Sequence, residues 1–573
     1  MINIYQLFPR LFGNKNQIAI KDGTIGENGC GKFSVLTTNV LENLRAFGFT
    51  HIWLTGVLRH ATLTDYSAYG IPVSHPSVVK GRAGSPYAVS DYYDVDPDLA
   101  DDPAKRMSEF EAAVERIHHA GMKVIIDFVP NHLARQYKSV CAPEGVRDFG
   151  ADDLTHLAFH PNNNFYYLPE QSFVPPQRES ALYASSETYL EQPAKATGND
   201  CFSAMPGHND WYETVKLNYG VDIMRDHAGY FDPIPDTWVK MEAILSFWAA
   251  KGIDGFRVDM AEMVPVAFWN WVIDSLKSKF TDLLLVAEIY QPGLNDKFIK
   301  AGFDFLYDKV GLYNKLHDIL IHNASAESIT NVWKSAEPYN HAMLRFMENH
   351  DEPRLASPRF YGDAFAAMPA VALSAWMHPT AFMVYNGQEC GETALGSPGF
   401  SGDDGRTTIF DYYNMPEHQK WMNNGSFDGK LLSFDQQRLR EMYRKILHFR
   451  LHQPALSKGV FYDLMWANPW YTEFDPWYVY AFARFSEEQN LLIIINFHRF
   501  EHREVRLNMH WDLMEQLKME QESGQLWFAK EIFEEREEIV FTPAEMPDKG
   551  LRIKLRPSQF AVYELKKIPQ TTK

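Results

Sequence analysis

Four short stretches of the sequence combine carboxylate or imidazole side chains with a preceding apolar run. They are Asp127-Phe128-Val129-Pro130-Asn131-His132, Gly255-Phe256-Arg257-Val258-Asp259, Ala287-Glu288-Ile289-Tyr290 and Glu348-Asn349-His350-Asp351. Carboxylates and imidazoles are the groups that transfer protons or attack electrophilic carbon at neutral pH. One such stretch alone is more often a helix cap or a salt bridge than a site. Four of them, each after an apolar run, predict one shared catalytic centre.

Arg257 and Asp259 form the most informative pair in these stretches. They lie two residues apart on a predicted strand, so their side chains point to the same face. The guanidinium of Arg257 is therefore expected to orient the carboxylate of Asp259 and to keep it ionised.

The elements that must position these residues alternate between strand and helix. Eight strands are predicted, at Ile2–Phe8, His51–Thr55, Lys123–Val129, Gly255–Asp259, Leu283–Ala287, Phe303–Tyr307, Leu344–Met347 and Ala381–Tyr385. Apolar residues at helical spacing surround the fourth strand, in Asp236–Ala250 and Val264–Lys279. Repeated strand–helix units predict an α/β fold, namely a (β/α)₈ TIM barrel.

Two segments depart from this alternation and predict further domains. Residues 133–236 have no clear period and are rich in Asn, Pro, Tyr and Phe, so we interpret them as a subdomain inserted after strand three. Residues 455–573 alternate apolar and polar side chains, which predicts a C-terminal antiparallel β-sandwich. The barrel is then formed by residues 1–132 and 237–454.

Composition excludes several classes of partner. The 573 residues carry a formal net charge of −19 without a basic stripe, which argues against nucleic acid and anionic membranes. Only four cysteines occur, without C-x-x-C spacing, so a disulfide framework or zinc site is not expected. The N-terminal residues have no features of a signal peptide, and a cytoplasmic location is the expectation. The oligomeric state is not indicated.

The predicted barrel brings the polar stretches to one mouth, because active sites of such barrels lie at the carboxyl ends of the strands. Asp259 and Glu288 follow adjacent strands and suit retaining cleavage of a glycosidic bond. That chemistry needs a carboxylate nucleophile and a carboxylic acid about 5–5.5 Å apart. Burial and the nearby negative charge are expected to keep the proton that Glu288 needs as the acid.

With these stretches in order, the sequence resembles the α-amylase superfamily, glycoside hydrolase family 13. The resemblance implies Asp259 as nucleophile, Glu288 as acid/base and Asp351 as the third carboxylate of the site. It also implies substrate-binding roles, which fall on Tyr87 as a stacking platform and on His132, Arg257 and His350. The implied substrate is an α-1,4-glucan or maltooligosaccharide, and no cofactor is implied as a requirement.

Two departures from the family pattern bear on metal binding and subfamily. Many α-amylases have Lys-His where this chain has Glu262 and Met263, so dependence on the usual calcium is not expected, although Asn131 could still be a calcium ligand. The stretch Val215-Lys216-Leu217-Asn218 resembles the neopullulanase version of the fifth family motif and favours maltodextrin processing inside the cell.

Two alternatives remain from the sequence. A 4-α-glucanotransferase shares all the catalytic residues and differs only in the acceptor of the glycosyl group. Aromatic residues around Tyr166, Trp211 and Tyr290 could form acceptor subsites, but core packing would explain each of them equally well. A non-catalytic binding or scaffold barrel is the minor alternative. Such a protein would be expected to lack at least one carboxylate, whereas this chain has all three together with Arg257 and both histidines.

Overall fold

The computed structural model describes residues 1–519 and 525–569. Eight parallel strands close into a barrel in the order β1-β16-β15-β14-β13-β12-β5-β2. They are β1 (Asn3–Leu7), β2 (His51–Leu54), β5 (Lys123–Phe128), β12 (Gly255–Val258), β13 (Leu284–Ala287), β14 (Phe305–Tyr307), β15 (Met343–Phe346) and β16 (Ala381–Tyr385). The predicted TIM barrel is confirmed, and strand limits differ from the prediction by only one or two residues.

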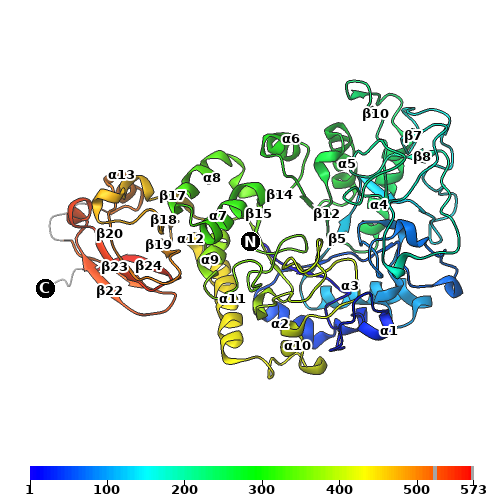
Figure 1. The fold of residues 1–573 in the computed structure, drawn as a ribbon. Coiled ribbons are helices and arrows are strands. Elements are labelled where there is room, and N and C mark those ends of the chain that lie inside the picture. Colours follow the sequence, from blue (N-terminus) through cyan, green and yellow to red (C-terminus); the bar gives the residue numbers. More distant parts are fainter. Residues whose placement is uncertain (520–524, 570–573) are drawn as a thin grey trace.

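Helices follow most of the barrel strands and cover the barrel (Figure 1). The helices of this part of the chain are α1 (Ile25–Asn28), α2 (Thr38–Phe47), α3 (Arg106–His119), α4 (Asp236–Ala250), α5 (Val266–Lys279), α6 (Asn295–Lys300), α7 (Asn314–His322), α8 (Ile329–Ser335), α9 (Met368–Trp376), α10 (Pro416–Met422), α11 (Phe434–His452) and α12 (Pro454–Ser457). Local sequence sets their ends. For example, Ser433 and Gln436 form a capping box at the start of α11, which satisfies two otherwise unpaired backbone N–H groups.

The strands in the segment between β5 and α4 are all short. They are β6 (His132–Ala134), β7 (Tyr167–Leu168), β8 (Ala194–Lys195), β9 (Thr214–Lys216), β10 (Val221–Asp222) and β11 (Ala228–Gly229). β6 pairs with β9 in antiparallel register, with His132 opposite Lys216. This pairing ties the insertion to the end of a barrel strand. A further two-stranded sheet, β3 (Leu58–His60) with β4 (Val89–Val95), flanks the same end of the barrel.

The C-terminal part is antiparallel, as predicted. A six-stranded sheet has the order β17-β18-β19-β24-β21-β22, and β20 pairs with β23. These strands are β17 (Val460–Asp463), β18 (Val479–Phe485), β19 (Asn490–Asn496), β20 (Arg503–Leu507), β21 (Trp527–Glu531), β22 (Glu538–Phe541), β23 (Leu551–Leu555) and β24 (Phe560–Lys567), and the helices are α13 (Trp511–Gln516) and α14 (Met546–Lys549). The sheets lie at one end of the molecule and the insertion at the other, with the barrel between them (Figure 1).

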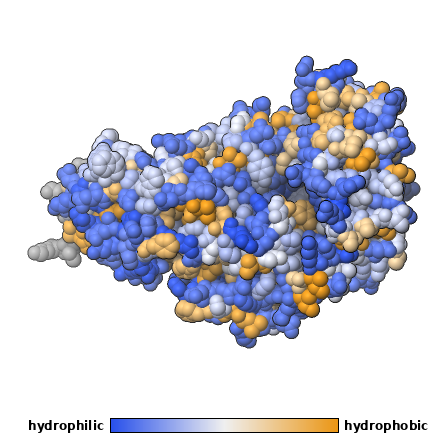
Figure 2. Space-filling model, in the orientation of Figure 1, coloured by the Kyte–Doolittle hydropathy of each residue, from blue (hydrophilic) through white to orange (hydrophobic). Residues whose placement is uncertain are grey.

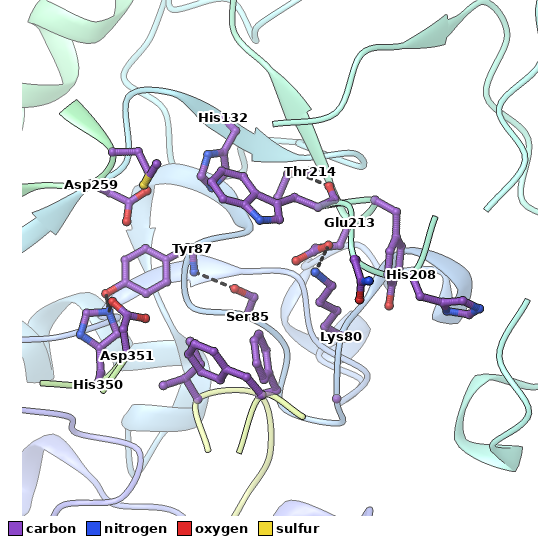
Figure 3. A pocket seen from close by; sticks show the side chains of 18 of the residues that line it. Lys80, Ser85, Tyr87, His132, His208, Glu213, Thr214, Asp259, His350 and Asp351 are labelled. Carbon is purple, nitrogen blue, oxygen red and sulfur yellow. Dashed lines mark hydrogen bonds and ion pairs between the residues drawn. The ribbon is translucent and has the colours of Figure 1, made fainter. Parts of the chain in front are cut away.

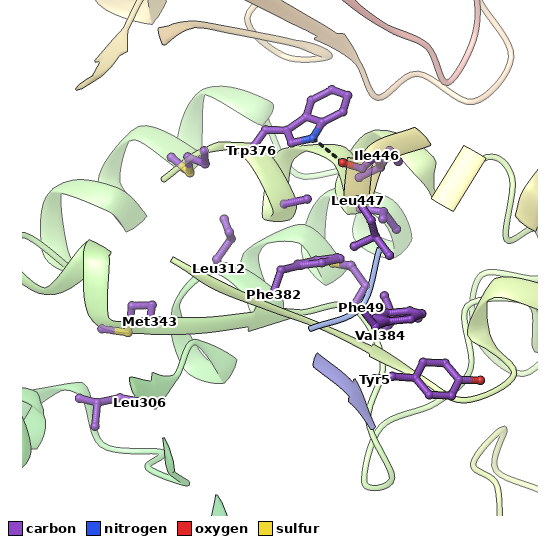
Figure 4. Close-up of a cluster of buried hydrophobic side chains, with 14 of the residues drawn as sticks. Tyr5, Phe49, Leu306, Leu312, Met343, Trp376, Phe382, Val384, Ile446 and Leu447 are labelled. Atoms are coloured by element: carbon purple, nitrogen blue, oxygen red, sulfur yellow. Dashed lines mark hydrogen bonds between the residues drawn. The ribbon is translucent and has the colours of Figure 1, made fainter. Parts of the chain in front are cut away.

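The hydrophobic core fills the space between the barrel and its outer helices. Figure 4 shows part of it, where Phe382 and Val384 of β16 approach Ile446 and Leu447 of α11. The indole N–H of Trp376 donates to the backbone oxygen of Ile446, which satisfies the one polar atom of a fully buried side chain. Apolar burial at this junction fixes the outer helices around the strands.

The outer surface has no extended apolar band on the face shown in Figure 2, where apolar residues form separate patches among hydrophilic ones. Within residues 1–519 and 525–569, no helix is both long enough and apolar enough to cross a membrane.

Candidate active site

A cavity of about 720 Å³ opens at the carboxyl ends of the barrel strands (Figure 3). Six of the seven predicted site residues line it, namely Tyr87, His132, Asp259, Glu288, His350 and Asp351. The seventh, Arg257, is buried beneath them and contacts two of the carboxylates. The structure thus brings all the predicted residues together, although they are spread along the chain from Tyr87 to Asp351.

Arg257 is the centre of the charge network. Its Nη1 donates to Asp259 Oδ1 at 2.8 Å, and its Nη2 lies 2.8 Å from Glu288 Oε1. Val258 pairs with Ala287 in the sheet, so Asp259 and Glu288 leave adjacent strands side by side. Since one planar guanidinium faces both carboxylates, their spacing is set by a rigid group.

The pKa of Asp259 differs from the expectation that was based on Arg257 alone. Burial raises the pKa of Asp259 well above its ordinary value, Arg257 opposes this shift, and the charges of Glu288 and Asp127 reinforce it. The sequence predicted an ionised carboxylate because the partner arginine is visible two residues away. The desolvation and the two other carboxylates come from the fold, and they outweigh that single partner.

Glu288 is surrounded by hydrogen-bond donors. The backbone N–H of Met260 donates to Oε2 at 2.8 Å, and the hydroxyl of Tyr290 donates to Oε1 at 2.7 Å. Together with Arg257, these groups leave few free lone pairs on the carboxylate. These contacts hold the Glu288 carboxylate beside Asp259 at the cavity.

His350 and Asp351 lie together with Tyr87 in the cavity (Figure 3). The hydroxyl of Tyr87 lies 2.5 Å from His350 Nε2, and that nitrogen is 3.2 Å from Asp351 Oδ2. Burial, then the charge of Glu288, raises the pKa of Asp351 to about 7. Burial lowers the pKa of His350 well below its usual range, so the ring is neutral.

Asp127 is the main site residue to which the sequence assigned no role. Its carboxylate accepts from the indole N–H of Trp53 at 3.1 Å and from the hydroxyl of Tyr87 at 3.3 Å, and it also faces Arg257. It lies in the first of the four polar stretches, so its position was visible but its partners were not. Arg406, which donates to the backbone oxygen of Asp351 at 2.6 Å, had no sequence signal.

The outer part of the cavity is formed by the insertion and by the loop between β3 and β4. Lys80 and Glu213 pair across it at 3.1 Å (Figure 3). The ring of Trp211 lies 5.1 Å from that of His132. Trp211 and Tyr290 line the cavity, as a subsite role requires. Tyr166 does not, because its ring is buried and its hydroxyl donates to the backbone oxygen of Val221.

Glu262 occupies one of the positions at which the family pattern is broken. Its carboxylate accepts the backbone N–H groups of Tyr290 and Gln291, each at 3.0 Å. The side chain therefore joins the turn after β12 to the turn after β13, next to Glu288.

The family described as "Alpha amylase, catalytic domain" matches residues 6–438. Among curated relatives, the α-amylase MalA of Haloarcula japonica is 26% identical over 394 residues, which are 68% of this chain and 44% of that protein. The human amino acid transporter heavy chain SLC3A1 is 24% identical over 321 residues, which are 55% of this chain and 35% of that one. The chain thus spans less than half the length of these two relatives.

Solved structures share the fold over nearly the whole chain. The noncanonic maltogenic α-amylase AmyB from Thermotoga neapolitana has a TM-score of 0.62 at 19% identity, with 98% of both chains covered. The α-amylase of Geobacillus thermoleovorans, complexed with acarbose, has a TM-score of 0.62 at 18% identity, with 99% and 98% covered. At these identities the likeness concerns the fold alone.

Proposed function

The chain belongs to the α-amylase family of catalytic domains, and we propose on this basis that it is a retaining glycoside hydrolase acting on α-glucans. Membership alone does not carry the proposal, since one relative is named an amino acid transporter heavy chain. The observation that carries it is the cavity in which Arg257 faces both Asp259 and Glu288 while Asp351 stands beside His350.

The proposed reaction has two displacements at the anomeric carbon. In the first, a carboxylate oxygen of Asp259 forms a bond to this carbon as its bond to the leaving oxygen breaks, and Glu288 gives that oxygen a proton. In the second, Glu288 takes a proton from water, the water oxygen bonds to the anomeric carbon, and the bond to Asp259 breaks. Asp259 must be ionised to attack, so its raised pKa requires the proton to move within the coupled carboxylates when substrate binds.

The remaining site residues are assigned to holding the sugar. Tyr87 presents an aromatic ring to the cavity, while His132, His350 and Asp351 present groups that can pair with hydroxyls. Linear maltodextrins are the proposed substrates. Their neutrality suits a chain of net charge −19, and relatives are named α-amylases and a maltase.

A cytoplasmic location belongs to the same proposal. All four cysteines are free, as is usual where thiols are kept reduced.

Glycosyl transfer is the second candidate, supported by a relative named α-1,4-glucan:maltose-1-phosphate maltosyltransferase, which is 25% identical over 239 residues. The two reactions share the first displacement and differ in whether water or a sugar hydroxyl completes the second. Product analysis on maltoheptaose separates them. Hydrolysis gives only shorter sugars, whereas transfer also gives longer ones.

Asp259→Asn tests the nucleophile. We expect loss of turnover on maltoheptaose with the melting temperature retained, because the amide keeps the shape of the side chain but cannot attack. A fluorinated glycosyl donor should label Asp259 of the wild type, as read by mass spectrometry of peptides. Asp254→Asn, at the other end of the same strand, is the matched control and should keep its activity. A label on a different residue would contradict the assignment.

A further inference from the structure

The side chain of Lys216 is buried where three parts of the chain meet. It extends from β9 of the insertion and is 3% exposed. Its ammonium donates to Asn131 Oδ1 after β5, to Asp200 Oδ1 of the insertion at 2.8 Å, and to the backbone oxygen of Met263 at 3.3 Å. An ammonium has three N–H donors and no acceptor, so these oxygens satisfy it completely.

This junction is also where the family resemblance places calcium, through Asn131. The residues present do not fit that ion. Calcium takes 6–8 oxygen ligands, usually with several carboxylates, whereas among residues 1–519 and 525–569 only the carboxylate of Asp200 contacts the Lys216 ammonium. The ammonium already occupies the space among the three oxygens, and its positive charge opposes a second cation there.

We propose that Lys216 is a built-in cation that joins the insertion to the barrel in place of a divalent ion and positions His132 through Asn131. The stability of the fold then needs no calcium. Lys216 touches no reacting group, so it is a positioning residue. The effect on activity rests on the proposed function, whereas the effect on stability does not.

The positioning follows from the hydrogen-bond donors of the Asn131 amide. Because Lys216 can only donate, the amide must turn Oδ1 toward it. The amide nitrogen then donates to the backbone oxygen of Gly198 at 2.7 Å and lies 3.1 Å from His132 Nδ1. His132 Nδ1 must therefore accept, and a neutral ring carries its proton on Nε2. Lys216 thus selects the tautomer of a histidine that lines the cavity.

The third contact acts on the turn that follows the proposed nucleophile. Met263 ends a 3₁₀ turn, Ala261–Met263, that begins directly after Met260. Met260 is held at a φ of +44°, a left-handed conformation that a non-glycine residue keeps only when neighbours enforce it, and its N–H donates to Glu288. The bond from Lys216 to Met263 holds the far end of this turn.

The test compares thermal unfolding of the wild type, Lys216→Met and Lys277→Met, each with EDTA and with millimolar calcium chloride. Lys277 is a matched control because its ammonium also joins two elements, through Asp304 at 3.1 Å and the backbone oxygen of Gly302 at 2.7 Å. We expect a wild-type melting temperature that is the same in both solutions, and a loss of several degrees in Lys216→Met beyond that in Lys277→Met. A wild-type melting temperature that falls in EDTA and recovers with calcium would overturn the proposal, as would equal losses in the two variants.

Kinetics on maltoheptaose test the positioning role. Lys216→Met should lower kcat/KM by about 10–100-fold, the usual effect of losing a group that orients a site ligand, and Lys216→Arg should recover part of it. A merely structural role would leave kcat/KM of the folded Lys216→Met equal to that of Lys277→Met, and this result would overturn the positioning. If the wild type neither cleaves maltoheptaose nor transfers glycosyl groups from it, the proposed function is wrong. The comparison of melting temperatures still tests whether Lys216 stabilises the junction as a built-in cation. If Lys216→Met does not fold, Lys216→Gln, which also lacks the positive charge, takes its place in both comparisons.

Discussion

At the scale of single residues, Glu288 makes the sharpest chemical demand. The glutamine of Glu288→Gln cannot give a proton to a leaving sugar oxygen, so hydrolysis of maltodextrins should fall by about 10²–10⁴-fold, the usual contribution of a general acid. The fluoride ion of an α-glucosyl fluoride leaves without protonation, so the reaction of this substrate with Asp259 should be largely retained. Stopped assays on both substrates give the comparison. Equal losses would show that Glu288 is not the acid, and Glu348 or Asp351 would then be examined.

Asp351 links the site to stability. Its pKa rises from an ordinary 3.8 to about 7 in the folded protein, so the fold favours the protonated form. At a pH below the pKa of the unfolded chain, Asp351 is protonated in both the folded and the unfolded state and does not change the free energy of unfolding. As pH rises from there to about 7, ionisation stabilises the unfolded chain more than the folded one, and stability is lost.

Asp351→Asn removes this cost and should raise the melting temperature at pH 8 but not at a pH below 3.8. Activity should be lost at both pH values. Asp428→Asn is the contrast, because hydrogen bonds from Lys430 and Asn423 lower the pKa of that exposed carboxyl to about 2. Its melting temperature should shift in the opposite direction, if at all. A destabilised Asp351→Asn at pH 8 would contradict the expected sign.

At the scale of elements, the loop between β3 and β4 carries Tyr87 to the cavity and depends on Gly84. This residue has a φ of +83°, and an added Cβ would lie 1.7 Å from the backbone oxygen of Ala61. The loop must therefore move if any side chain is added there. Gly70 has a similar φ of +75° but open space around it, so it separates backbone strain from steric overlap.

Gly84→Ala and Gly70→Ala should differ for this reason. Gly70→Ala should cost about 1–2 kcal/mol of unfolding free energy, the penalty of a left-handed alanine. Gly84→Ala should cost more and should also raise KM, because the displaced loop carries Tyr87. Denaturant unfolding and steady-state kinetics on maltoheptaose measure the two effects. Equal losses with unchanged KM would mean that the loop absorbs the Cβ.

At the scale of the whole molecule, Arg484 of β18 joins the C-terminal sheet to the barrel. Its guanidinium is fully buried and donates to backbone oxygens, those of Trp376 at 2.7 Å, Gly459 at 2.8 Å and Leu456 at 3.0 Å. In the folded protein these carbonyl groups accept hydrogen bonds from one charged donor in place of water. Removing it leaves several of them buried and unpaired.

Arg484→Met should therefore lower the free energy of unfolding by about 3 kcal/mol or more, at about 1–3 kcal/mol for each orphaned group. Arg552→Met is the control, since Arg552 is an exposed arginine in the same C-terminal part and pairs with the exposed Glu473. Its effect should stay within about 0.5 kcal/mol, as for most surface positions. Urea unfolding of both variants provides the measurement, and similar losses would show that the buried bonds do not hold the two parts together.

The sequence by itself determined the eight strands, the antiparallel C-terminal part and which polar residues follow the barrel strands. Apolar runs such as Leu283–Ala287 predict buried strands because burial on both faces removes the polar alternation. Glu288 follows that run directly, so a local pattern sufficed to place it at a strand end. The 3₁₀ turn at Ala181–Tyr183 and the short strands of the insertion were missed because each spans too few residues to show a period.

Only the tertiary structure decided how the site residues act on one another. Tyr87 and His350 are 263 residues apart in the chain, and no local pattern predicts that the hydroxyl of one meets the ring of the other. The raised pKa of Asp259 comes chiefly from burial, which depends on every element packed around it. Lys216 was visible in the sequence as one residue of a family-like stretch. Its role as a cation depends on three oxygens that distant turns bring together, because electrostatic contacts are set by distance in space and not along the chain.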